Sequence, residues 1–162
     1  MNRNNAVSFS IRPAAPGDEG SIVALLRELA VYEKAPVFTL RESDAARDLL
    51  GAQRSALCHL LFVKGEAVAI SVALRTYRSF RAARGLYVED LYVRPAYRGR
   101  GLGKALLARL AAQAHAEGGF LEWLVLDWNA HAIAFYESLG ARPVTEWTGY
   151  RLEGDALERL AS

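Results

Sequence analysis

A short stretch near residue 100 constrains the fold of this chain more than any other part of the sequence. Residues 94–105 read RPAYRGRGLGKA, with glycine at three of the five positions from Gly99 to Gly103. Each glycine loses more backbone entropy on folding than other residues do, so a loop this rich in glycine indicates that the main chain must be free of side chains there. A strand-like apolar run precedes the loop and a helix-like run follows it. The chain is therefore expected to place a strand, the loop and a helix N-terminus in that order.

A helix N-terminus behind such a loop is a binding site for an oligophosphate. Its first N–H groups have no partner within the helix and carry a partial positive charge. Arg98, Arg100 and Lys104 add full positive charges around those N–H groups. We therefore expect the loop to bind a pyrophosphate.

Two common phosphate motifs do not fit the spacing of this loop. A Walker A loop needs four residues between its glycines and a hydroxyl after its lysine, whereas three residues separate Gly99 from Gly103 and an alanine follows Lys104. The dinucleotide fingerprint needs glycine or alanine at its sixth position, but counting from Gly99 or from Gly101 places a lysine or a leucine there. An ordinary strand-to-helix connection with solvated arginines remains as an alternative.

Composition indicates one globular domain without a disulfide. The chain has 162 residues, of which 52% are hydrophobic and 23% charged. Its formal charge of +2 means that basic and acidic side chains nearly balance, which disfavours a protein whose main role is to bind nucleic acid or an anionic membrane. The single cysteine, Cys58, has no disulfide partner within the chain, and no apolar run approaches the length of a membrane span. We expect a soluble cytoplasmic protein with one domain over residues 1–162, whose residues 1–8 are flexible.

Hydrophobic periodicity predicts a mixed α/β sandwich, with a central mixed sheet flanked by helices. The expected order of elements is β-α-α-β-β-β-α-β-α-β-β. Strands are expected over residues 7–13, 56–64, 67–78, 85–93, 120–127, 142–147 and 150–153. Helices are expected over residues 17–32, 40–50, 102–117 and 129–139. A parallel strand pairing is expected across the helix at 102–117.

The loop from Arg98 to Gly103 resembles the Arg/Gln-x-x-Gly-x-Gly/Ala motif of the GNAT superfamily of N-acetyltransferases, which binds the pyrophosphate of acetyl-coenzyme A. The expected element order is also that of the GNAT fold. Further segments are similar to the spermidine/spermine (diamine) acetyltransferase branch and its thialysine-acetylating relatives, namely residues 29–33, 87–93, 127–129 and 133–136. The resemblance implies a homodimeric enzyme that transfers the acetyl group of acetyl-coenzyme A to a primary amine of a small molecule. The amine would be a diamine, a polyamine or a thialysine-like amino acid.

The resemblance also implies a role for individual residues. The residues expected to bind acetyl-coenzyme A are Leu91, Tyr92, Val93, Arg98, Gly99, Arg100, Gly101, Leu102, Gly103, Lys104, Asn129 and Tyr136. Those expected to contact the amine are Tyr32, Glu33, Glu89, Asp90, Glu122, Trp123 and Leu124. Glu89 and Tyr136 are the expected catalytic residues.

The two catalytic residues match the two proton transfers that the reaction needs. An alkyl ammonium with a pKa of about 10 cannot attack a thioester, so a base such as Glu89 has to remove its proton near pH 7, through water. A phenol such as Tyr136 can protonate the leaving thiolate. The resemblance further implies that the oxyanion accepts a hydrogen bond from the Leu91 N–H, at the place where this strand bulges in GNAT enzymes. By itself the sequence also permits Asp90 as a strand-edge carboxylate that meets an arginine, and Tyr136 as a core aromatic.

Other functions remain open at this point. One is a protein N-terminal or lysine acetyltransferase of the same fold, and another is a regulatory module that binds acyl-coenzyme A without turnover. A nucleic-acid binder built on the arginines of residues 78–84 is disfavoured by the balance of charge. No metal is expected, because neither His59 nor His131 has further ligands at metal-binding spacing. Thr148 stands where the polyamine enzymes carry an acidic residue, which favours an acceptor with one amine and a carboxylate over a polyamine.

Overall fold

The computed structural model describes residues 8–162, and the chain divides into two compact units between Leu124 and Val125. Residues 1–7 lie outside the described residues. They include all but Ser8 of the segment expected to be flexible, and the first residue of the strand expected over residues 7–13. The expectation of a single domain stays a prediction.

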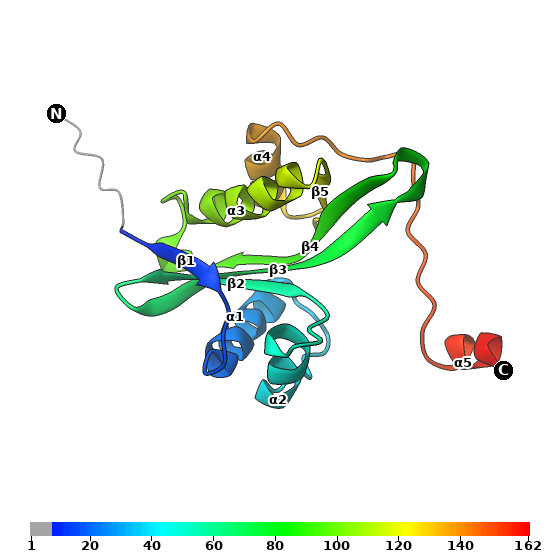
Figure 1. Ribbon diagram of the computed structural model, residues 1–162, viewed down its shortest axis with the longest axis horizontal. Coiled ribbons are helices and arrows are strands. Elements are labelled where there is room, and N and C mark those ends of the chain that lie inside the picture. Colours follow the sequence, from blue (N-terminus) through cyan, green and yellow to red (C-terminus); the bar gives the residue numbers. More distant parts are fainter. Residues whose placement is uncertain (1–7) are drawn as a thin grey trace. The chain divides into compact units, whose positions relative to one another are not determined.

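The first unit is built on a five-stranded sheet in the order β1-β2-β3-β4-β5 (Figure 1). Its strands are β1 (Ser10–Pro13), β2 (Leu57–Val63), β3 (Glu66–Arg78), β4 (Ala83–Val93) and β5 (Phe120–Trp123). Neighbours from β1 to β4 pair antiparallel, and β5 joins β4 in parallel. The turn between β2 and β3 uses left-handed backbone at Lys64 and Gly65, with φ of 51° and 83°. The mixed sheet and the parallel pairing across the helix at 102–117 are therefore confirmed.

Helices cover both faces of this sheet (Figure 1). On one face lie α1 (Glu19–Tyr32), the short α2 (Glu42–Ala45) and a π-helical turn, η1 (Ala46–Leu50). On the other face lies α3 (Leu102–Ala116). Short 3₁₀ turns, η2 (Ser79–Arg81) and η3 (Pro95–Tyr97), flank β4. The helix expected over residues 40–50 is thus a single α-helical turn that continues as π-helix.

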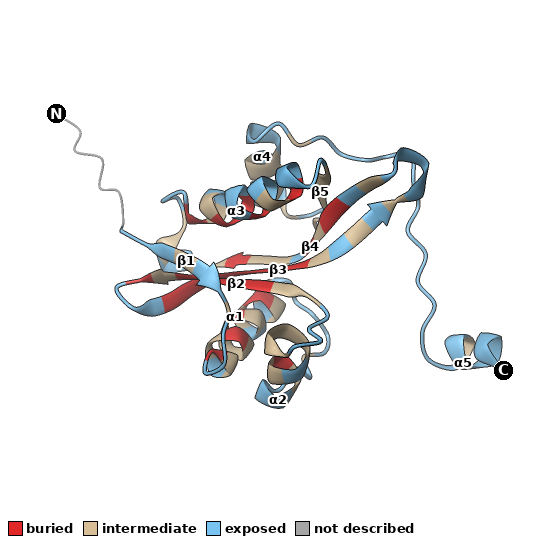
Figure 2. Cartoon of the chain, viewed as in Figure 1, coloured by how far each residue is buried: buried red, intermediate tan, exposed pale blue. Residues whose placement is uncertain are grey.

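Two apolar clusters hold the helices onto the sheet, one on each face (Figure 2). Leu25 of α1 packs in one cluster with Leu60 and Ile70 of the strands. Leu106 of α3 packs in the other with Leu61. Burying an aliphatic side chain of this size contributes about 1.5–3 kcal/mol, so these contacts position α1 and the start of α3 relative to β4.

The second unit, Val125–Ser162, contains two helices, α4 (Ala130–Ser138) and α5 (Asp155–Ala161). The strands expected over residues 142–147 and 150–153 are wrong, because these residues have no regular structure. Trp147 and Tyr150 are 80% and 95% exposed. An alternating apolar pattern forms a strand only where a neighbouring strand offers an edge, and the described residues of this unit contain no strand. The strand expected over 120–127 likewise ends early, at Trp123.

Candidate active site

The strand β4 carries an irregularity at Glu89. In its register with β3, Asp90 pairs with Val72 and Val88 pairs with Ala73, so Glu89 has no partner on β3. An extra residue of this kind re-aims the side chains around it. Glu89 is exposed, whereas Val88 is buried. The irregularity lies two residues before Leu91, whose N–H the family resemblance places at the bulge of this strand.

Beyond this point β4 has an unpaired edge. The parallel pairing with β5 ends at Val88 and Trp123, while β4 continues to Val93. Within the described sheet, Leu91, Tyr92 and Val93 therefore have no strand partner on the β5 side. Main-chain N–H and C=O groups on a free edge can pair with an extended ligand, as in strand addition.

The glycine loop follows directly at the end of β4. Gly99 and Gly101 have φ of 71° and 78°, a left-handed conformation that glycine adopts without strain. The first helical hydrogen bond of α3 runs from the Ala105 N–H to the Gly101 carbonyl at 3.0 Å, so the N–H groups of residues 102–104 precede it. No heavy atom lies within 4 Å of a Cβ built on either glycine. The loop thus presents free amides beside open space, which suits a pyrophosphate.

The charged side chains of the loop point to different surroundings. The Arg98 Nε donates to the Val93 carbonyl at 2.9 Å, and its guanidinium lies 4.8 Å from the centre of the Tyr32 ring. Arg100 and Lys104 are exposed. Arg98 therefore connects the glycine loop to the end of α1, where Tyr32 and Glu33 lie, while the other two cations face solvent.

A network around Arg94 holds the same end of β4 and was missed in the sequence analysis. Its guanidinium donates to Glu28 of α1 at 2.9 Å and to Glu66 at the start of β3 at 2.6 Å. The hydroxyl of Tyr92 also donates to Glu28, and that of Tyr97 to Glu66, each at 3.3 Å. Arg94 precedes the proline before the glycine loop, but nothing in the sequence indicates its two partners, which lie 66 and 28 residues away.

Three carboxylates gather beside the bulge, namely Glu33, Glu89 and Asp90. Burial, and then the negative charges of Glu89 and Glu33, raise the pKa of Asp90 to about 7. Partial burial and then Glu89 raise the pKa of Glu33. Within residues 8–162 the Asp90 carboxylate has no hydrogen bond or ion pair, so an arginine partner for Asp90 is not found. A cluster of this kind favours a cationic ligand.

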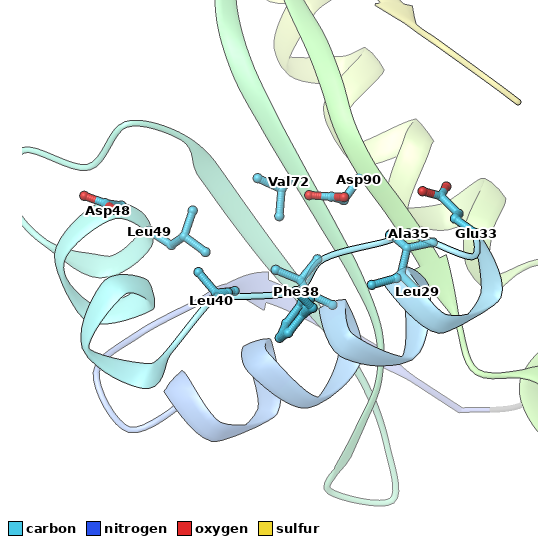
Figure 3. Close-up of a pocket in the computed structure, with 11 residues that line it drawn as sticks. Leu29, Glu33, Ala35, Phe38, Leu40, Asp48, Leu49, Val72 and Asp90 are labelled. Atoms are coloured by element: carbon cyan, nitrogen blue, oxygen red, sulfur yellow. The ribbon is translucent and has the colours of Figure 1, made fainter. Parts of the chain in front are cut away.

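A cavity of about 370 Å³ opens beside two of these carboxylates (Figure 3). It lies between the end of α1, the loop after α1, η1 and the sheet. Most of its wall is apolar, formed by Leu26, Leu29, Phe38, Leu40, Leu49, Val72 and two alanines. Glu33, Asp48 and Asp90 are its charged lining residues. Its volume is in the range of small-molecule sites, which is about 300–1,000 Å³.

Of the other residues expected to contact the amine, Glu122 already has a partner. Its carboxylate accepts a hydrogen bond from Arg78, whose guanidinium also lies over the Phe120 ring. Trp123 ends β5, and Leu124 is 84% exposed. Their expected contacts with the amine stay predictions.

The second unit holds the remaining expected site residues. The Asn129 side chain accepts a hydrogen bond from the Ala132 N–H at 3.2 Å and so caps α4. Tyr136 lies in α4, half-buried, with its ring 5.3 Å from that of Phe135. Their roles in cofactor binding and proton transfer stay predictions.

Comparison with known proteins gives a consistent family. Residues 23–141 match the model of the acetyltransferase (GNAT) family. Thialysine N-epsilon-acetyltransferase of Bos taurus is 37% identical over 164 residues, covering 93% of this chain and 96% of the bovine protein. L-ornithine N5-acetyltransferase of Arabidopsis thaliana is 49% identical over 85 residues, which are 52% of this chain and 37% of the plant protein.

A solved structure shares the fold. An integron cassette protein from the mobile metagenome of V. cholerae superimposes with a TM-score of 0.79 and 24% identity, over 95% of this chain and 98% of that protein. Among the described residues no helix is long and apolar enough to cross a membrane, and no cluster of three or more His, Cys, Asp or Glu side chains could hold a metal ion.

Proposed function

This chain belongs to the GNAT family of acetyltransferases, and on that premise we propose that it moves the acetyl group of acetyl-coenzyme A to the primary amine of a small molecule. The observation that supports this most is the free edge of β4, which begins beside three carboxylates and ends at the glycine loop. One strand, one loop and one helix start thus offer an edge for the acyl chain, anions for an ammonium and amides for a pyrophosphate.

The cofactor is expected to lie along this strand, loop and helix start. Its pyrophosphate would accept hydrogen bonds from the amides of the loop, near the exposed side chains of Arg100 and Lys104. The amides of its pantetheine arm would pair with Leu91, Tyr92 and Val93 as an added strand. The thioester carbonyl would then lie beside the bulge, where the Leu91 N–H can donate to the developing oxyanion.

The reaction needs one base and one acid. Glu89 is exposed in the bulge and is expected to take a proton from the ammonium through water. The amine nitrogen then forms a bond to the thioester carbon, and the carbonyl electron pair moves to oxygen. Collapse of this intermediate breaks the carbon–sulfur bond, and we assign Tyr136 as the donor of the proton that the leaving thiolate takes up. The second proton of the attacking nitrogen, lost as the neutral amide forms, is expected to return through water to the Tyr136 phenolate, while the proton on Glu89 passes to solvent.

The acceptor class rests on the acidic cluster and on the relatives. The relatives are named for thialysine and L-ornithine, which each carry a side-chain amine. Diamines and polyamines belong to the same proposal, although Thr148 does not supply the acidic partner that a second ammonium would use. A homodimer is proposed on the family resemblance. A cytoplasmic location is proposed because the single cysteine, Cys58, which is buried, cannot form a disulfide within the chain.

A thiol-release assay with acetyl-coenzyme A tests the proposal. The panel contains spermidine, putrescine, thialysine, lysine and an aminoglycoside, together with a peptide that has a free N-terminus and a lysine. Release that depends on a small amine supports the proposal, and release with the peptide alone supports a protein acetyltransferase. Calorimetric binding of acetyl-coenzyme A without release for any acceptor would instead indicate a regulatory module.

A further inference from the structure

The cavity beside Asp90 has two unlike ends. Figure 3 shows Glu33 at one end and Asp48 at the other, with Leu49, Phe38 and the Asp90 side chain between them. Apart from the three carboxylates, its lining residues are all apolar, and none of them is a lysine or an arginine. A ligand that fills this cavity therefore contacts carboxylates and apolar side chains, because the lining contains no positively charged residue.

The two ends also differ in how far their charges are satisfied. Asp48 accepts hydrogen bonds from the Nε and terminal nitrogen of Arg47 at 2.8 and 2.6 Å. Asp90 has no such partner among the described residues, and it lies next to the bulge at Glu89. A ligand cation is thus expected in the part of the cavity between Asp90 and the end at Glu33, next to the bulge of β4.

We propose that this cavity binds an acceptor amine whose body is apolar and whose far end is uncharged, such as an unbranched alkylamine. The ammonium lies by Asp90 and Glu33, and the hydrocarbon extends past Phe38 and Leu49 towards the pair of Asp48 and Arg47. This inference rests on the proposed function, because it names the class of amine that reaches the acetyl group.

The same walls disfavour a second charge on the acceptor. A carboxylate at the far end would leave water for apolar side chains, and the cation beside that end, Arg47, is already paired with Asp48. A second ammonium would have to compete with Arg47 for Asp48. Amino acids and diamines, which the family resemblance implies as acceptors, therefore fit this cavity less well than an amine of equal length with a methyl end.

Calorimetry with the full-length protein tests the proposal without relying on catalysis. Across propylamine, butylamine, pentylamine and hexylamine, the dissociation constant is expected to fall about fourfold for each methylene, which corresponds to about 0.8 kcal/mol. Hexylamine is expected to bind at least tenfold more tightly than 1,6-diaminohexane and 6-aminohexanoate, which match its chain length. Affinity that is equal along the series, absent for all amines, or better for either charged homologue would overturn the proposal.

Two substitutions locate the hydrocarbon. Leu49→Phe keeps the wall apolar and shortens the cavity, so it should weaken hexylamine about tenfold and leave propylamine within threefold of wild type. Leu49→Gln should weaken hexylamine at least as much, because the chain then meets an amide. Leu50→Phe is the matched control, since Leu50 also lies in η1 but does not line the cavity. Equal effects of the two phenylalanine variants on hexylamine, with both folded by thermal melting, would contradict the assignment.

Thiol release with the same amines separates this inference from the proposed function. The order of kcat/KM is expected to follow the order of affinity. Binding that follows the methylene series without acetyl transfer to these amines or to any amine of the panel above would refute the proposed function and leave the cavity assignment standing. Transfer that favours 1,6-diaminohexane or 6-aminohexanoate would support the function and overturn the assignment.

Discussion

The carboxylate of Asp90 is expected to lower the stability of the free protein at neutral pH. Its pKa is raised from 3.8 to about 7, mainly by burial and then by Glu89 and Glu33. A carboxyl group whose folded pKa exceeds its unfolded pKa favours folding only while it is protonated. The free energy of unfolding that it contributes is therefore fully present below about pH 3.8 and is lost as the pH rises towards 7.

The substitution Asp90→Asn removes this charge and keeps the size of the side chain. The shift from 3.8 to about 7 is about three pKa units, and each unit corresponds to about 1.36 kcal/mol, so the upper limit is about 4 kcal/mol. Water and side-chain relaxation reduce the penalty, so we expect the variant to be about 2–4 kcal/mol more stable than wild type at pH 8. At pH 4 the two proteins should differ little, because Asp90 is then neutral when folded.

Urea unfolding at pH 4 and pH 8 measures this difference. Asp48→Asn is the control, because Arg47 lowers the pKa of Asp48 by hydrogen bonding, so its loss should bring no gain at pH 8. The reasoning is refuted if Asp90→Asn is less stable than wild type at pH 8, or if the difference between them is the same at both pH values. We also expect the variant to bind amines more weakly, since it loses an anion of the site.

Four further predictions concern catalysis, cofactor binding and acid stability. Glu89→Gln should lose turnover at pH 7 and recover part of it towards pH 10, where solution supplies free amine; an anchoring role would instead raise KM at every pH. Tyr136→Phe should lower kcat by about 10² and change cofactor affinity only a few fold, whereas wild-type turnover would exclude the phenol as the acid. Gly101→Val should weaken acetyl-coenzyme A at least tenfold in calorimetry, and Gly118→Val, also at a left-handed position next to α3, should not; equal losses would point to backbone strain alone. Burial and then the charge of Arg109 lower the pKa of His59, so the free energy of unfolding, measured with urea, should fall as the pH drops below 6.5. It should fall less for His59→Phe, and parallel pH curves of the two proteins would contradict this.

Short-range signals predict much of the fold. The turn at Lys64 and Gly65, the helix pattern of residues 102–117 and the glycines at 99 and 101 act within a few residues of the chain. Backbone conformation and hydrophobic periodicity are properties of such short segments. The antiparallel strands, the parallel return to β5 and the helix start behind the glycine loop are therefore where the sequence predicts them.

The C-terminal segment shows the opposite case. The pattern of residues 142–153 is that of two strands, yet a strand is stable only beside another strand, and a local pattern does not specify that partner. The same holds for the end of β5 at Trp123, which leaves the edge of β4 free. Pairing over long distances in the chain decided both features.

The sequence determined the glycine loop and the family, and the family resemblance grouped Glu89, Asp90 and Glu33 among the residues expected to contact the amine. Only the tertiary structure decided what surrounds them: the unpartnered carboxylate of Asp90, the apolar cavity that ends at Asp48, and the clamp of Arg94 on Glu28 and Glu66. Burial and pairing depend on residues that lie far apart in the chain. The raised pKa of Asp90 and the walls of the cavity therefore arise only when these residues pack together and exclude water.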